Sequence, residues 1–135
     1  MLKNQRGFSL VEIMIVLAII GIIVGLASSG INYFEKAKVK EAKVKIKQIS
    51  DALEMYYTDC SIYPTTDQNL DALVEAPSDC EEWGPEPYLK KVPKDPWKRA
   101  YIYESDGSDY EIKSLGKDRK EGGEGLGKDI SSADD

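Results

Sequence analysis

Glu12 is the residue whose position most clearly calls for a chemical explanation, because it is the only ionisable side chain between Phe8 and Ala27. An ionised carboxylate at membrane depth costs about 3 kcal/mol or more, so such a residue indicates a functional site. A protonated amine would supply the missing partner, since pairing offsets the cost of removing a charge from water. The residues alone therefore predict a functional role for Glu12.

A second candidate site is the segment from Leu115 to Ile130, which combines several glycines with carboxylates. Calcium binds six to eight oxygens, supplied by carboxylates and by carbonyls of a loop flexible enough to wrap the ion. By composition alone the segment is also compatible with a disordered acidic tail. The carboxylates available to a cation are Asp118, Glu121, Glu124 and Asp129.

Other kinds of site find no support in the residues. The chain has no histidine and only two cysteines, so a zinc site of ordinary ligand spacing is not expected. It has no Gly-x-Ser-x-Gly sequence and no phosphate-binding glycine loop with its lysine. The glycines from Gly122 to Gly127 neither follow a buried strand nor precede a helix, which argues against a nucleotide site. We expect a protein that is not an enzyme.

The element that must position Glu12 is the apolar run from Phe8 to Ala27, which is long enough as a helix to cross a bilayer. A short basic leader with Lys3 and Arg6 precedes it and ends in Gly7. A secretory signal would instead end its apolar stretch at a small-residue cleavage site. A simple signal anchor is the alternative, but it leaves the Gly7–Phe8 junction unexplained.

Charge is distributed unevenly along the chain. Between Glu35 and Lys47 six lysines face two glutamates, whereas from Asp51 onward ten basic residues face twenty-one acidic ones. A basic segment beside a membrane span usually marks the cytoplasmic side, although Lys3 and Arg6 compete with it for that orientation. The lysine run is interpreted as the solvated face of a helix, and no nucleic-acid partner is expected.

A helical pattern continues beyond the apolar run. Apolar residues recur at spacings of three and four, which places them on one face of an amphipathic helix. One long helix is therefore predicted from the membrane to about Tyr57, and its second half needs a folded partner to cover the apolar stripe. The stripe comprises Val39, Ala42, Ile46, Ile49, Leu53 and Tyr56.

The remaining sequence predicts a small α+β domain. Thr65 and Gln68 fit a capping box for a short helix that buries Leu70, Leu73 and Val74 and ends before Pro77. Segments 100–104 and 110–115 flank Ser105-Asp106-Gly107-Ser108, which is typical of a β-hairpin. We expect this antiparallel sheet to cover the helical stripe, and no clear candidate for a third strand is visible.

The N-terminal stretch Gly7-Phe8-Ser9-Leu10-Val11-Glu12-Ile13 resembles the class III signal of type IV pilins and type II secretion pseudopilins. The resemblance implies that a prepilin peptidase cleaves after Gly7 and methylates the new N-terminal Phe8. It also implies that Glu12 neutralises the N-terminal amine of a neighbouring subunit in a filament. Many relatives carry a proline near Ser29, and this chain does not.

Further along, YPTTDQNLDALVEAP, Tyr88-Leu89-Lys90-Lys91 and Pro93-Lys94-Asp95-Pro96-Trp97 resemble the G pseudopilin family of type II secretion in order and spacing. The resemblance implies a pilin-like fold and a homopolymer that drives export of folded proteins across the outer membrane. The alternative is the major pilin of a surface type IV pilus. Implied partners are prepilin peptidase, minor pseudopilins, the inner-membrane assembly platform and, before assembly, membrane lipid.

The strings SLG-x-D and GGEG-x-x-x-DI are similar to the calcium-binding loop of that family. The resemblance implies Ca²⁺ ligands at the Leu115 carbonyl and at the carboxylates of Asp118 and Asp129, with Glu124 as a further candidate. Two positions depart from the family pattern. Arg119 stands where glycine is common, and Gly127 stands where a second aspartate is common.

The resemblance also implies a domain plan: a leader at 1–7, a membrane and assembly helix at 8–29, and a globular domain at 30–135. The chain would cross the inner membrane once, with that domain in the periplasm. In an oxidising periplasm, two cysteines in a small domain more often pair than stay free. We therefore expect a disulfide between Cys60 and Cys80, which is not a usual feature of the family.

Overall fold

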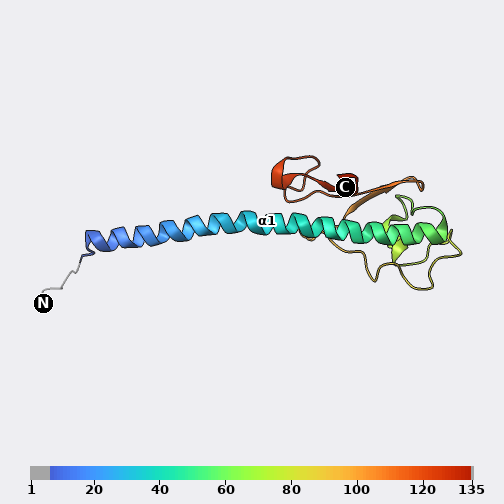
Figure 1. Cartoon of the computed structure of the whole chain (residues 1–135), viewed down its shortest axis with the longest axis horizontal. Coiled ribbons are helices and arrows are strands. Elements are labelled where there is room, and N and C mark those ends of the chain that lie inside the picture. The colour runs from blue at the N-terminus through green and yellow to red at the C-terminus, as the bar shows by residue number, and fades with distance from the viewer. Residues whose placement is uncertain (1–6, 135) are drawn as a thin grey trace. The chain divides into compact units, whose positions relative to one another are not determined.

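The structure is a computed structural model in which residues 7–134 are described (Figure 1). The predicted leader residues Lys3 and Arg6 lie outside this range. The chain divides into two units, one ending at Phe34 and the other beginning at Glu35. This division lies a few residues beyond the predicted domain boundary at 29 and 30.

One helix, α1, runs from Leu10 to Cys60 and contributes to both units. In the first unit its apolar side chains are exposed all round the helix, and Phe8, just before it, is 79% exposed. The helix stays continuous through Ser28 and Ser29, whose hydroxyls donate to the carbonyls of Val24 and Gly25. Without a proline at this point, the helical hydrogen bonds are not interrupted.

In the second unit, α1 buries the predicted stripe except for its first residue, Val39, which is half-buried. Ala42, Ile46, Ile49, Leu53 and Tyr56 are all buried. They pack with aromatic and aliphatic side chains of the sheet and of the 3₁₀ helix η1 (Asn69–Leu73). Figure 1 shows the strands beside the second half of α1. The sheet and η1 contribute Leu70, Leu73, Tyr103, Ile112 and Ile130 to this core.

Thr65 and Gln68 form the two hydrogen bonds of the predicted capping box, with the Thr65 N–H donating to Gln68 Oε1 at 2.8 Å and the Gln68 N–H donating to Thr65 Oγ1 at 3.4 Å. These bonds lie in the turn before the helix and do not cap it, because the N-cap residue is Gln68 and it makes no side-chain cap hydrogen bond. The helix that follows, η1 (Asn69–Leu73), is a 3₁₀ helix. Its residues Leu70 and Leu73 are buried, and Val74 is half-buried.

The sheet has three antiparallel strands in the order β1 (Ile102–Ser105), β2 (Tyr110–Ser114) and β3 (Ile130–Ser131). The hairpin between β1 and β2 confirms the prediction, with Tyr103 opposite Ile112. Strand β3 pairs with the end of β2, where Ser114 lies opposite Ile130. Two further 3₁₀ helices, η2 (Gly125–Gly127) and η3 (Ser132–Asp134), flank β3.

Candidate assembly, disulfide and calcium sites

Glu12 lies in the first turn of α1, where the positive end of the helix dipole favours a carboxylate. Its neighbours on the helix are apolar and exposed, among them Leu10, Val11 and Ile13. Helix α1 is long and apolar enough to cross a membrane, and none of its most apolar stretch is buried among the described residues. The side chains around Glu12 are therefore available to lipid or to other chains.

Gly7 and Phe8 precede the helix in a segment without regular secondary structure. A peptidase needs an accessible, unfolded backbone at the bond it cleaves, and the position just outside α1 meets that requirement. A Cβ added at Gly7 would meet no other atom within 4 Å. The described fold itself therefore does not explain why glycine stands at this junction.

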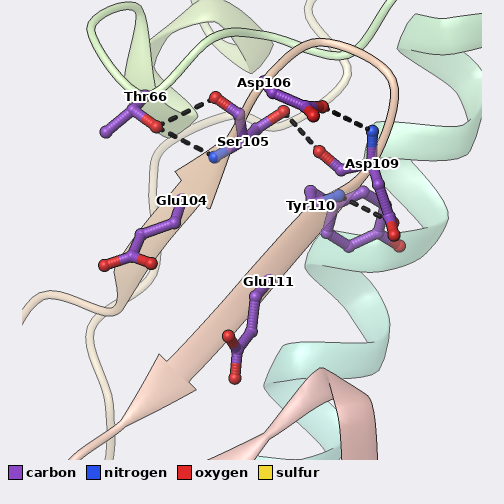
Figure 2. A pocket seen from close by; sticks show the side chains of 7 residues that line it. All are labelled: Thr66, Glu104, Ser105, Asp106, Asp109, Tyr110 and Glu111. Atoms are coloured by element: carbon purple, nitrogen blue, oxygen red, sulfur yellow. Dashed lines mark hydrogen bonds between the residues drawn. The ribbon is translucent and has the colours of Figure 1, made fainter.

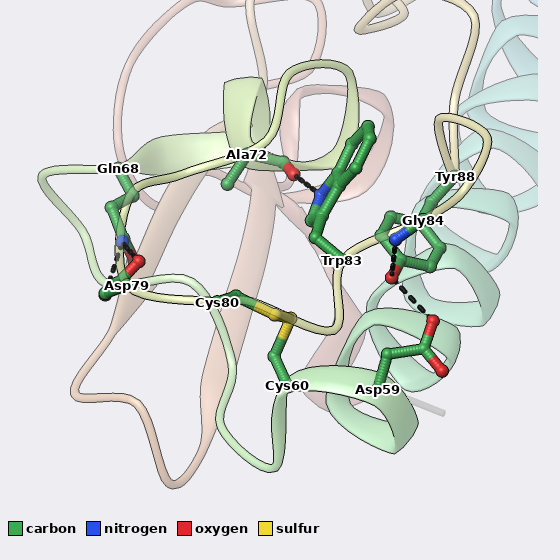
Figure 3. Close-up of a disulfide and its surroundings, with 9 residues drawn as sticks. All are labelled: Asp59, Cys60, Gln68, Ala72, Asp79, Cys80, Trp83, Gly84 and Tyr88. Carbon is green, nitrogen blue, oxygen red and sulfur yellow. Dashed lines mark hydrogen bonds between the residues drawn. A yellow bond between two sulfur atoms is a disulfide. The ribbon is translucent and has the colours of Figure 1, made fainter.

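Cys60 and Cys80 are joined in a disulfide, with their Cα atoms 5.4 Å apart (Figure 3). The bond links the last residue of α1 to the loop that follows η1. Close by, the indole N–H of Trp83 donates to the Ala72 carbonyl at 2.8 Å. The Tyr88 hydroxyl donates to Asp59 at 2.6 Å, so the loop is attached to the end of α1 at two points.

We expect loss of this disulfide to destabilise the second unit by about 3 kcal/mol, because the closed loop restricts the unfolded chain. The double variant Cys60→Ala/Cys80→Ala should still fold, since the core contacts of α1 remain. Urea unfolding followed by the fluorescence of Trp83 and Trp97 would measure the difference. An unchanged midpoint, or both thiols open to alkylation in intact cells, would contradict the bridge.

The buried tyrosines do not offer proton-transfer groups near neutral pH. Burial raises the pKa of Tyr103 to about 12, and its hydroxyl donates to the Pro64 carbonyl at 2.7 Å. Burial, together with the negative charge of Asp79, raises the pKa of Tyr56 to about 12. Both groups stay protonated over the physiological range, in agreement with a role in core packing.

A shallow hollow of about 490 Å³ lies at the turn between β1 and β2 (Figure 2). Its walls are held by local hydrogen bonds: the Thr66 hydroxyl donates to the Ser105 carbonyl, and the Ser105 hydroxyl donates to the Asp109 carbonyl. Hydrogen bonds from Ser108 lower the pKa of Asp106. The Asp106 carboxylate therefore stabilises the turn between β1 and β2.

The predicted calcium loop lies between β2 and β3. Asp129 is half-buried; one of its carboxylate oxygens, Oδ2, accepts from the Gly122 N–H at 2.9 Å, and the other, Oδ1, is buried without a hydrogen-bond partner. A buried, unpartnered carboxylate oxygen is costly, and a cation is a suitable partner for it. Among residues 7–134, no three His, Cys, Asp or Glu side chains form a group that could hold a metal ion.

Asp118 packs against two glycines of the same loop. A Cβ on Gly123 would lie 2.7 Å from Asp118 Oδ2, and one on Gly127 would lie 3.0 Å from it. Glycine at 127 therefore leaves room for the Asp118 carboxylate. Arg119 has a φ of 65°, the left-handed conformation that glycine adopts without strain and other residues adopt rarely.

The carboxylates of this loop could coordinate calcium only together with oxygens of the backbone. Asp118 and Asp129 both lie against the Gly122–Gly123 pair, whereas Glu124 is exposed before η2 in extended backbone. Two carboxylates supply too few oxygens for calcium, so carbonyls and water would have to complete the shell. Of the predicted ligands, Asp118 and Asp129 are the two whose side chains lie against the same pair of glycines.

A long N-terminal helix, apolar in its first half and amphipathic in its second, with a small antiparallel sheet on the second half, defines a pilin-like protein. Residues 2–28 match the prokaryotic N-terminal methylation motif, and residues 30–133 match the family described as type II secretion system (T2SS), protein G. The chain belongs to this protein G family.

Relatives named type II secretion system core protein G agree with this assignment. One from Vibrio cholerae serotype O1 is 40% identical over 97% of this chain and 93% of its own length. One from Pseudomonas aeruginosa is 41% identical over 98% of this chain and 97% of its own length.

A solved structure supports the fold. The major pseudopilin from the type 2 secretion system of enterohaemorrhagic Escherichia coli is similar with a TM-score of 0.65 and 30% identity, covering 74% of this chain and 86% of that one. The chain is therefore a structural pseudopilin and not an enzyme, and the surface type IV pilin is the less well supported alternative.

Proposed function

We propose that this chain polymerises from the inner membrane into a homopolymeric pseudopilus whose growth drives folded proteins across the outer membrane. The observation that carries the proposal is the first unit, in which the apolar side chains of α1 are exposed on every side around Glu12. Such a helix requires an apolar environment, first membrane lipid and then the matching helices of other copies. A heterologous contact that does not close into a ring produces a filament.

Deleting the gene should stop export of the organism's secreted proteins, and the wild-type gene should restore it. The secreted fraction would be compared by mass spectrometry with the periplasmic fraction, where the blocked proteins should accumulate. Normal export in the deletion strain, together with loss of surface motility, would instead favour the surface pilin.

The proposed location is the inner membrane, with a single span and the C-terminal domain in the periplasm. The Cys60–Cys80 disulfide supports this orientation, because disulfides persist in oxidising compartments and are rare in the cytosol. The proposed partners are prepilin peptidase, the minor pseudopilins and the inner-membrane assembly platform.

We expect the mature chain to begin at Phe8, N-methylated, after removal of residues 1–7 by prepilin peptidase. Intact-mass spectrometry of the membrane form should show loss of Met1 to Gly7 and gain of one methyl group. Gly7→Leu should block processing, because a side chain at the cleavage junction would exclude the peptide from a site shaped for glycine. Assembled filaments that retain the leader would refute the assignment.

We also propose that the loop from Leu115 to Ile130 binds one calcium ion through the Leu115 carbonyl and the carboxylates of Asp118 and Asp129, with Glu124 as a further candidate. The unpartnered Asp129 Oδ1 supports the proposal. Calcium would neutralise the carboxylates and link the two ends of the loop. Its oxygen ligands in an irregular loop suit calcium better than the strict octahedron of magnesium.

Calcium should raise the melting temperature of the full-length chain in detergent, and a chelator should lower it. A ligand bound only by the folded state adds about 2.7 kcal/mol of stability at a hundredfold excess over Kd. Asp118→Asn and Asp129→Asn should each lose this response. Glu121→Gln is the matched control, because Glu121 lies in the same loop, its side chain is 83% exposed, and it contacts Lys113 at 3.7 Å.

Equal melting temperatures in calcium and in chelator would show that the loop is only an acidic loop. A response to magnesium as large as the response to calcium would contradict the choice of ion. A loss of response in Glu121→Gln would show that the assigned ligands are wrong.

A further inference from the structure

The turn Pro93–Trp97 contains a buried carboxylate, Asp95, that has no role in the proposed function. Asp95 is only 3% exposed. Its Oδ1 accepts hydrogen bonds from the Trp97 N–H at 3.0 Å and the Arg99 N–H at 2.7 Å. These two bonds hold the turn itself and are an ordinary structural role for aspartate.

The other oxygen of Asp95 points elsewhere. Oδ2 accepts from the Ser114 hydroxyl at 2.8 Å, a contact between residues far apart in the chain. Ser114 is the last residue of β2, and it is 1% exposed. Because an ionised acceptor strengthens a hydrogen bond, this buried bond fixes the hydroxyl of Ser114 in one orientation.

Ser114 in turn holds the start of the calcium loop through a hydrogen bond to Gly116. With its proton donated to Asp95, its oxygen accepts from the Gly116 N–H at 3.3 Å. Gly116 has a φ of +66°, and a Cβ there would lie 2.9 Å from the Lys128 carbonyl oxygen. The segment held by Asp95 therefore contains Leu115, whose carbonyl is a proposed ligand, and packs against the far end of the loop beside Asp129.

The turn that carries Asp95 is itself anchored to α1. The Trp97 indole N–H donates to Glu35 at 3.2 Å, and the Lys45 ammonium donates to the Lys94 carbonyl at 3.0 Å. Backbone hydrogen bonding between Asp95 and Arg99 closes the turn at 2.7 Å. Asp95 is thus attached to a fixed support in the second unit and not to a free loop.

We propose that Asp95 is a positioning residue for the calcium loop, acting through Ser114 to hold the backbone from Ser114 to Gly116 in the conformation that presents the Leu115 carbonyl. The inference rests on the calcium site of the proposed function and adds to it a group that does not touch the ion. A pre-ordered loop loses less conformational entropy on binding, so the network should raise calcium affinity. It also gives the turn Pro93–Trp97 a role.

The test compares Ser114→Ala and Asp95→Asn in the full-length chain in detergent. Ser114→Ala removes the link but keeps both hydrogen bonds of Asp95 Oδ1, so it separates positioning of the loop from the fold of the turn. Asp95→Asn keeps Ser114, so its effect on Gly116 must pass through the hydroxyl. Ser108→Ala is the matched control, because its hydroxyl donates to the Asp106 carboxylate at 2.7 Å in the β1–β2 turn.

Two measurements decide the outcome. Calorimetric titration with calcium should show at least a tenfold weaker Kd in Ser114→Ala and in Asp95→Asn, and no larger loss when they are combined. Hydrogen exchange in chelator should show at least tenfold faster exchange of the Gly116 amide in Asp95→Asn. Ser108→Ala should change neither quantity.

Unchanged Gly116 exchange in Asp95→Asn would overturn the proposal, as would an unchanged calcium Kd in both variants of a calcium-binding chain. If the wild-type chain itself shows no calcium binding, the calcium site fails, and the exchange measurement in chelator still decides whether Asp95 orders the loop. If Asp95→Asn does not fold, the Kd of Ser114→Ala decides, and an unchanged Kd in that variant would overturn the proposal.

Discussion

Replacing Glu12 with leucine is expected to reduce filaments in the sheared fraction at least tenfold while leaving the amount of protein in the membrane unchanged. Leucine is favourable in a membrane helix and glutamate is not, so insertion does not suffer. In the filament, Glu12 would lose its ion pair with the N-terminal amine of Phe8 in a neighbouring copy. Breaking a buried pair costs about 3–5 kcal/mol because one charge is left uncompensated.

Filament yield would be measured by electron microscopy and immunoblotting of sheared cells, and membrane levels by blotting of the membrane fraction. Val11→Leu is a matched control, because it changes an adjacent, exposed apolar residue of α1 without changing charge. Wild-type filament yield from Glu12→Leu would refute the intersubunit role. Reduced membrane levels would show that insertion was affected instead.

Leu53→Ala should have the largest effect on the stability of the second unit. Leu53 is 0% exposed and lies in the centre of the stripe that α1 packs against the sheet and η1. Truncation of a buried leucine to alanine costs about 2–5 kcal/mol, through lost burial and the cavity that remains. Small domains are stable by only about 5–15 kcal/mol, so a large share of the total would be lost.

Urea unfolding followed by tryptophan fluorescence measures this effect selectively, because the chain's two tryptophans, Trp83 and Trp97, both lie in the second unit. Met55→Ala is the control, since Met55 lies two residues further along α1 and is 59% exposed. Its midpoint should shift little. Equal shifts for Leu53→Ala and Met55→Ala would show that the stripe is not the core of this unit.

Local patterns were sufficient to predict much of this protein. The uninterrupted apolar run and the lone Glu12 indicate a membrane helix with one functional carboxylate, because hydrophobicity and charge act on each residue directly. The two hydrogen bonds between Thr65 and Gln68 form as predicted, since these residues are only three apart, although the bonds lie in the turn before η1 and do not cap it. With only two cysteines, Cys60 had a single possible partner within the chain.

Other features depend on contacts between distant segments and had no local signal. Strand β3 has two residues, too short for a periodic pattern, and it forms only because the end of β2 offers hydrogen-bonding partners. The left-handed backbone of Arg119 and the close approach of Gly127 to the Asp118 carboxylate likewise had no local signal and are visible only in the structure.

Asp95 is the clearest example of a residue whose contacts cannot be predicted from the local sequence. In the sequence it is one residue of a turn between two prolines, and nothing nearby indicates a partner. The tertiary structure brings Asp95 to Ser114, nineteen residues away, where water is excluded and a carboxylate must be satisfied by hydrogen bonds. The sequence by itself therefore determined the apolar helix, the amphipathic stripe and the hairpin. Only the packed structure decided which buried polar groups meet, because such contacts depend on how distant segments pack together and exclude water.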